Sequence, residues 1–175
     1  MSLKSGAPRT KKWPRYCFYA AVVLLLIAVI IYVIYCQSIN SEFGYAEAFY
    51  GDRFDELYAL SEIDEDIFDP IVKQGRKALE FIGTEEECAA YGVLSRYCTD
   101  MQTYPEAHSA KVSIDAIAAA TEGRTGYLWV AYTQNIYDAQ GTLICESGSE
   151  DQRILSRWTV EKIDGVWTVT EVSEP

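Results

Sequence analysis

Few side chains in this sequence combine the types and spacing that catalysis requires. His108 is the only histidine, and it lies in a polar stretch that is predicted to be a loop, with no partner nearby in sequence. Asp115 interrupts an alternating apolar stretch, and Tyr127 and Tyr132 lie in the stretch after it. A tyrosine–carboxylate pair inside a cavity would polarise a bound oxygen atom, so these four residues are candidate cavity residues. The simpler expectation places Asp115 on the solvent face of an edge strand.

Other motifs that carry chemistry are missing from the sequence. It contains no glycine-rich phosphate loop, nucleophile elbow or HExxH. One histidine and no CxxC leave no zinc pattern, and the acids between residues 62 and 69 lack the spacing of a calcium loop. We therefore expect no catalytic residue, cofactor or metal. Within the acidic run, Asp64, Glu65 and Asp66 are instead candidates for contact with a partner.

A long uncharged run near the start of the chain predicts a membrane span. Residues 17–36 carry no charge, and twenty helical residues match a hydrocarbon core of about 30 Å. A core helix and a cleaved signal peptide are the alternatives, but no small-x-small cleavage site follows the run. We expect an uncleaved anchor over residues 16–37. Aromatic residues, which favour membrane interfaces, lie near its two ends: Trp13, Tyr16, Tyr19, Tyr32 and Tyr35.

The charges on the two sides of this run predict an orientation. Residues 1–39 hold five basic side chains and no acid, whereas the rest holds ten basic and all 26 acidic side chains, a net charge of −16. Basic flanks stay in the cytoplasm, so residues 1–15 are predicted to be a cytoplasmic tail and residues 38–175 a domain outside the cell membrane. The negative charge of that domain excludes nucleic acid as a partner, because phosphates demand the opposite sign.

Three of the five cysteines fall in the predicted outer domain, where disulfides are permitted. Cys88 and Cys98 are ten residues apart. On one continuous helix they would be about 15 Å apart, too far to bond. We expect buried free thiols at Cys88, Cys98 and Cys145, although the sequence leaves disulfides open.

The first part of the predicted domain has helical patterns. Residues 41–60 carry apolar side chains at spacings of three and four, which predicts a helix with one buried face. Asp69 followed by Pro70 predicts the start of a second helix, which ends before Gly83. A Thr-x-x-Glu capping box at residues 84–87 predicts a third helix, extending to about residue 101.

The second part has strand patterns and a clear hairpin. Asp164-Gly165 is a two-residue turn, and the register it sets gathers the apolar side chains of both strands on one face. The other face is predicted to be wet, which makes it a candidate docking surface. Helices followed by antiparallel strands predict an α+β domain with helices on one face of a curved sheet. The apolar face holds Trp158, Val160, Trp167 and Val169, and the wet face holds Thr159, Glu161, Thr168 and Thr170.

The order of elements in residues 41–175 resembles the nuclear transport factor 2-like fold, a cone-shaped sheet that also houses ketosteroid isomerases. The pattern W-x-V-x-x-x-D-G-x-W-x-V carries the resemblance, through Trp158, Val160, Asp164, Gly165, Trp167 and Val169. A short tail, one anchor and such a domain also resemble in layout the bitopic assembly proteins of type IV secretion and conjugation machines. The first resemblance implies a cone-like domain, and the second implies a part in an envelope or secretion complex.

Two functions fit these observations. The first is a single-pass, membrane-anchored domain that binds other envelope proteins or copies of itself in an assembly. The alternative is a cone that binds or converts a small ligand, as an isomerase or dehydratase would. An open cavity of a few hundred Å³ with Asp115 or His108 pointing into it would favour the alternative.

Overall fold

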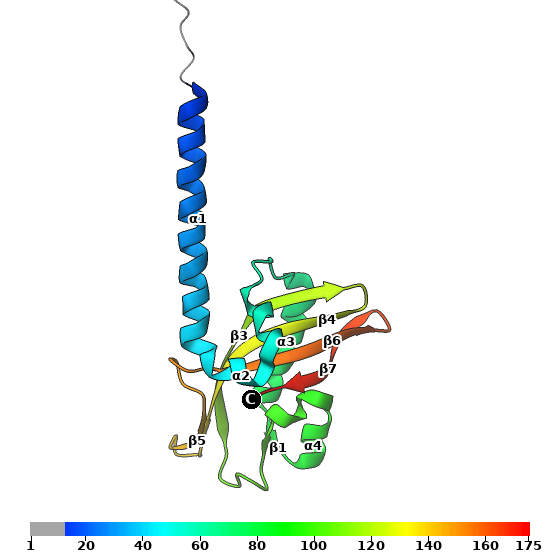
Figure 1. Cartoon of the computed structure of the whole chain (residues 1–175). Coiled ribbons are helices and arrows are strands. Elements are labelled where there is room, and N and C mark those ends of the chain that lie inside the picture. Colours follow the sequence, from blue (N-terminus) through cyan, green and yellow to red (C-terminus); the bar gives the residue numbers. More distant parts are fainter. Residues whose placement is uncertain (1–12) are drawn as a thin grey trace, which may run out of the picture. The chain divides into compact units, whose positions relative to one another are not determined.

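The computed structural model describes residues 13–175, which fall into two compact units, residues 13–38 and Ile39–Pro175. Helix α1 (Trp13–Phe43) supplies the first unit and continues into the second (Figure 1). Residues 16–34 of α1 are all exposed, and its most apolar window has a mean hydropathy of 3.0. Among the described residues, α1 is the one helix long and apolar enough to cross a membrane. Most of the predicted basic tail, residues 1–12, lies outside the described residues.

Most of the apolar stripe of residues 41–60 is buried, although Phe49 is exposed, and the continuous helix predicted there is wrong. After α1, the chain forms η1 (Gly44–Ala46), α2 (Glu47–Tyr50) and η2 (Gly51–Tyr58). Gly51 has a positive φ of 55°, which ends α2 and turns the chain. The short helices still bury every third or fourth residue, as the spacing requires: Phe43, Ala46, Tyr50, Phe54 and Leu57.

Helix α3 (Glu65–Glu80) begins five residues earlier than predicted, since the expected N-cap is Asp69. Asp64 is its N-cap, and Glu65 and Asp66 occupy its first turn, where negative charge is favourable beside the helix dipole. Pro70 consequently lies inside the helix and not at its first position.

The third predicted helix, like the first, is shorter than expected. Its capping box is confirmed, since Glu87 N donates to Thr84 Oγ1 at 3.3 Å and Thr84 N donates to Glu87 Oε2 at 2.9 Å. The helix α4 (Glu85–Ala89) then ends, and Gly92, with a φ of 60°, reverses the chain into η3 (Gly92–Tyr97). Strand β2 (Thr99–Asp100) returns to pair in parallel with β1 (Ile82–Gly83).

A five-stranded antiparallel sheet completes the unit and confirms the α+β class. Its order is β3-β4-β6-β7, with β5 paired to β4, and it does not close on itself. The strands are β3 (Ser109–Glu122), β4 (Thr125–Tyr137), β5 (Leu143–Ser147), β6 (Ile154–Ile163) and β7 (Val166–Ser173).

The final hairpin follows the predicted register for half of its length. The turn residues Asp164 and Gly165 have φ of 50° and 86°, and pairing proceeds as predicted as far as Val160 and Val169. A bulge then shifts the register, so that Trp158 faces Val172 and not Glu171, the partner that an unbroken register from the turn predicts.

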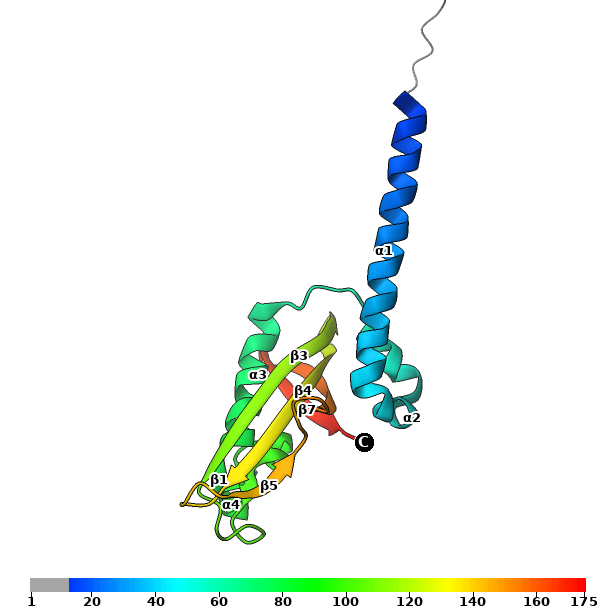
Figure 2. The same cartoon turned by 90° about the vertical axis from the view of Figure 1, so that its left-hand side faces the viewer.

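Side chains cover both faces of the sheet, so the predicted one-sided burial is wrong. Residues 128–132 of β4 are all buried, although successive side chains point to opposite faces. On one face, α3 packs against Leu128, Val130 and Trp158. On the other, Tyr50 of α2 contacts the Trp129 ring at 4.5 Å between centroids. Figure 2 shows α3 and α2 on opposite sides of the sheet.

The face of the hairpin that was predicted to be solvent-exposed is therefore exposed only in part. Thr159 and Thr170 are half-buried, and Thr170 Oγ1 donates to the carbonyl oxygen of Thr159 at 3.4 Å. Glu161 and Thr168 are exposed and form a directly opposed pair.

Trp158 of β6 is fully buried, and α3 and η3 cover it. Its Nε1 donates to Tyr97 Oη at 2.8 Å and lies 3.0 Å from Ser156 Oγ. A Cβ on Gly75 of α3 would overlap the edge of the indole, so only glycine permits this approach. Trp167, predicted to be equally buried, is half-buried at the edge of the same core.

Trp158→Ala should lower the free energy of unfolding by about 3–5 kcal/mol, because it removes a buried indole and leaves a cavity. Trp167→Ala should cost less, since that ring is only half-buried. Thr168→Ala is the matched control on an exposed site and should change stability by no more than about 0.5 kcal/mol. Urea unfolding of residues 39–175 measures all three, and equal losses for Trp158 and Thr168 would contradict the packing described.

Candidate functional site

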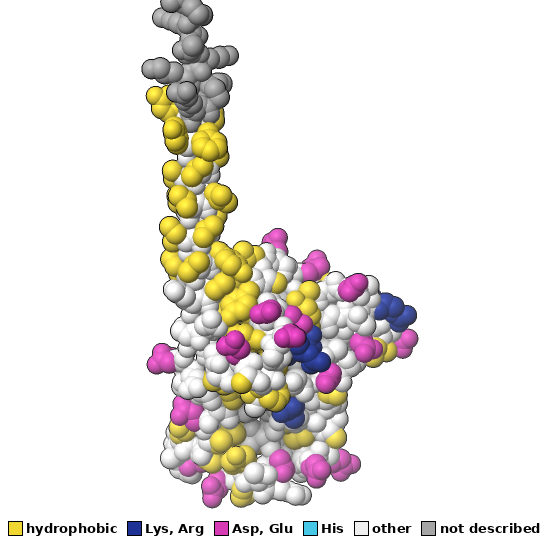
Figure 3. Space-filling view, viewed as in Figure 1, with side chains coloured by type: hydrophobic (Ala, Val, Ile, Leu, Met, Phe, Trp, Pro, Cys, Tyr) yellow, Lys and Arg dark blue, Asp and Glu magenta, His cyan; other side chains and the backbone are white. Residues whose placement is uncertain are grey.

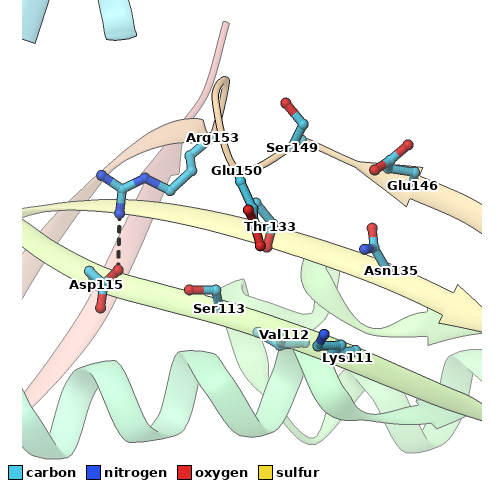
Figure 4. Close-up of a pocket in the computed structure, with 11 residues that line it drawn as sticks. Lys111, Val112, Ser113, Asp115, Thr133, Asn135, Glu146, Ser149, Glu150 and Arg153 are labelled. Carbon is cyan, nitrogen blue, oxygen red and sulfur yellow. Dashed lines mark hydrogen bonds and ion pairs between the residues drawn. The ribbon is translucent and has the colours of Figure 1, made fainter.

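A polar groove lies on the α2-facing side of the sheet, where β3, β4 and β5 run together. Its volume is about 570 Å³. The segment between β5 and β6 borders it, as Figure 4 shows. The lining residues are Lys111, Val112, Ser113, Asp115, Thr133, Asn135, Glu146, Gly148, Ser149, Glu150 and Arg153.

A row of unlike polar groups crosses the groove from strand to strand. Lys111 of β3 is directly opposite Asn135 of β4, which is opposite Glu146 of β5. Asn135 Oδ1 is buried and accepts no hydrogen bond in the part of the chain that the structure describes. An unpaired buried acceptor is costly, so a donor supplied from outside would stabilise this row.

Arg153 closes one end of the groove with two carboxylates. Its Nε donates to Glu42 Oε1 at 2.6 Å, and Nη1 donates to Asp115 Oδ2 at 3.0 Å. The hydrogen bond that Arg153 donates to Glu42 is the main cause that raises the pKa of Arg153. The Glu42 side chain is 26% exposed and that of Asp115 62%, so Glu42 is the better-shielded partner. Asp115 thus lines the groove as half of an ion pair.

The four candidate cavity residues do not come together. Asp115 lies in the groove, whereas Tyr132 lies on the opposite face, edge-on to Tyr97 at 5.3 Å. Tyr127 shares the sheet face of Asp115 but lies near the start of β4, away from the groove. There the guanidinium of Arg157 covers its ring, 5.1 Å from the ring centroid. His108 is exposed just before β3, and its backbone nitrogen donates to the carbonyl oxygen of Tyr137.

A tyrosine–carboxylate cluster does exist, but from residues that sequence reasoning missed. Tyr97 Oη donates to Glu174 Oε1 at 2.7 Å and also contacts Ser156 Oγ at 2.7 Å. Burial is the main cause that raises the pKa of both Tyr97 and Tyr132, so both phenols stay protonated. Nothing in the polar end of the sequence marks Glu174 as partly buried. Its partners come from segments far away in the chain.

The acidic candidates Asp64, Glu65 and Asp66 are exposed at the N-terminal end of α3. That position already accounts for their charge, because acids stabilise the positive end of a helix dipole. Among the described residues, no group of histidines, cysteines or acids is arranged to hold a metal ion.

Comparison with known proteins adds no family to this description. No protein-family model matches the chain, and no curated protein matches it at a significant level.

Glu42→Gln should lower the free energy of unfolding by about 1–3 kcal/mol, because it removes a charged hydrogen bond to a largely buried guanidinium. Asp115→Asn should cost less than about 1 kcal/mol, since its carboxylate is mostly in solvent. Urea unfolding of the two variants gives the comparison. A larger loss for Asp115→Asn would show that Asp115, and not Glu42, holds Arg153.

Proposed function

We propose that this chain is a single-pass membrane protein whose second unit binds partner proteins outside the cytoplasm. The observation that carries the anchor is the exposure of residues 16–34 of α1, an uninterrupted apolar surface. Soluble proteins rarely expose so large an apolar surface, whereas a bilayer covers it without cost. The span then lies within residues 16–37.

The charge distribution supports the orientation. The segment before the span is basic and free of acids, and the remainder carries 16 more acids than bases. Basic flanks are retained in the cytoplasm, which leaves the acidic unit on the other side of the cell membrane. Figure 3 shows acidic side chains scattered over one side of the second unit, with few Lys or Arg among them.

The second unit is, in our proposal, an open variant of the nuclear transport factor 2-like cone. Short helices before the sheet and the Asp164-Gly165 hairpin support this relationship. The space beneath α3, on one face of the sheet, is filled by Trp158, Tyr97 and Leu128. A filled interior favours a docking domain over an enzyme with a central cavity.

The groove on the opposite face is the proposed docking site. Glu146 and Glu150 line it and form no ion pair among the described residues, while Asp115 is paired with Arg153. An extended basic segment fits this arrangement, since its side chains would meet the two acids and its N–H groups could donate to Asn135. Partners would be other envelope proteins or further copies of this chain, as in secretion and conjugation assemblies. Because partners confined to one membrane have a raised effective concentration, weak contacts are sufficient for assembly.

A second candidate function is the binding of a small polar ligand in the same groove, whose volume of about 570 Å³ and lining by Asp115 match the cavity expected for that alternative. The unpaired Asn135 Oδ1 beside Lys111 favours it, because together they offer an acceptor and a cation. Unlike docking, this function would not depend on Glu146 and Glu150 being accessible to a second protein.

Glu146→Lys with Glu150→Lys should reduce capture of neighbouring proteins several-fold, because it replaces two unpaired acids with bases. Capture is measured in native membranes with a photo-crosslinking residue at Ser149, which lines the groove. Glu106→Lys with Glu122→Lys is the matched control, since both acids are exposed and neither lines the groove. Equal capture by the two double variants would contradict docking through the groove, and a small molecule retained by the purified chain would favour the second candidate.

A further inference from the structure

Cys88 and Cys98 lie in segments that the fold brings back together. Cys88 is on α4, and Cys98 directly precedes β2. Gly92 reverses the chain between them, and the parallel pairing of β1 and β2 draws the return segment alongside, with Thr99 N donating to the carbonyl oxygen of Phe81 at 2.9 Å. The expectation that one long helix separates these cysteines by about 15 Å is therefore wrong, because that helix does not form.

Both cysteines are free thiols in the structure, as expected, and α4 packs against η3 and β2, the elements on either side of Cys98. Cys88 is 5% exposed, and Cys98 is half-buried against the cluster beneath α3. Burial raises the pKa of the Cys98 thiol to about 12, and the adjacent Cys88 contributes both through its charge and through a side-chain hydrogen bond. Burial, followed by the charges of Cys98 and Cys88, raises the pKa of the Tyr91 phenol.

We propose that Cys88 and Cys98 form a disulfide that closes the α4–η3 loop. The reaction is an exchange with the disulfide of an oxidised thiol oxidoreductase. One cysteine thiolate attacks that disulfide and releases a thiol, and the other then attacks the mixed disulfide and releases the second. The two cysteines lose two electrons and two protons, and the oxidant leaves as two thiols. Oxidation within the cell rests on the proposed orientation, because disulfides persist outside the cytoplasm.

The position of the bond gives it a structural role. The loop that it closes contains Arg96 and Tyr97. Arg96 pairs with Glu174 at 3.2 Å, and Tyr97 accepts the hydrogen bond from Trp158. A closed loop restricts these two residues in the unfolded chain as well, which favours the folded state. The oxidised chain should therefore unfold at a higher urea concentration than the reduced chain.

Peptide mapping tests the pairing directly, because trypsin cleaves after Arg96, between the two cysteines. Cys88 falls in the peptide 78–96 and Cys98 in the peptide 97–111, and each peptide has one cysteine. The full chain, purified in detergent, is equilibrated with reduced and oxidised glutathione, blocked with N-ethylmaleimide and digested without reductant. We expect the two peptides as one linked species, about 2 Da lighter than their sum because two hydrogens are lost.

Cys88→Ser and Cys98→Ser should each abolish the linked species, and Cys145→Ser is the control that should leave it unchanged. Both peptides recovered separately as maleimide adducts, or Cys98 linked to Cys145, would overturn the proposal. The same digest on cells blocked at lysis tests the compartment. A link formed in glutathione but missing in cells would leave the pairing intact and count against the proposed orientation instead.

Discussion

The burial of the Trp158 indole is the constraint on which the second unit depends. A side chain of this size at the centre of β6 can be covered only if α3 approaches closely, and Gly75 permits that approach by having no Cβ. The indole N–H must also be satisfied, which Tyr97 Oη and Ser156 Oγ achieve. Tyr97 in turn donates to Glu174, so the end of the chain is fixed by the same indole.

The opposite face of the sheet is held by charged hydrogen bonds around the buried indole of Trp129. Glu56 accepts from both Arg157 and the indole nitrogen of Trp129, at 2.8 Å and 2.7 Å. Glu42 similarly accepts from Arg153. These two acids, from segments flanking α2, attach that layer to the sheet. Because Arg153 is held by Glu42, the groove beside it has a defined end, and the acids further along remain accessible.

The features predicted correctly from the sequence are those that depend on residues close together in the chain. The exposed apolar helix, the Thr84–Glu87 capping box and the Asp164-Gly165 turn each depend on residues close together in the chain. The missed features depend on distant packing. Periodicity alone predicts one helix over residues 41–60, whereas positive φ at Gly51 breaks it so that the stripe can wrap the sheet. The chain reversal at Gly92 was missed for the same reason, because the apolar spacing on both sides of Gly92 predicts one continuous helix.

Only part of the candidate site could be predicted from the sequence. Alternation placed Asp115 on an edge strand and exposed, as the structure has it. Its ion pair with Arg153 required the fold, since the two residues are 38 positions apart. The row of Lys111, Asn135 and Glu146 required knowledge of which strands are neighbours, and β5 pairs with β4 through a register shift that no spacing indicates.

The central claim, that the acidic unit is displayed outside a membrane crossed once by α1, is tested most directly by site-specific proteolysis of intact cells. A protease recognition sequence is inserted between Ala139 and Gln140, two exposed residues of the turn after β4, and in a second variant after Lys4. With protease added outside the cell membrane, we predict cleavage of the first variant and protection of the second until the membrane is dissolved in detergent. Cleavage after Lys4 with protection of the Ala139–Gln140 site would contradict the account.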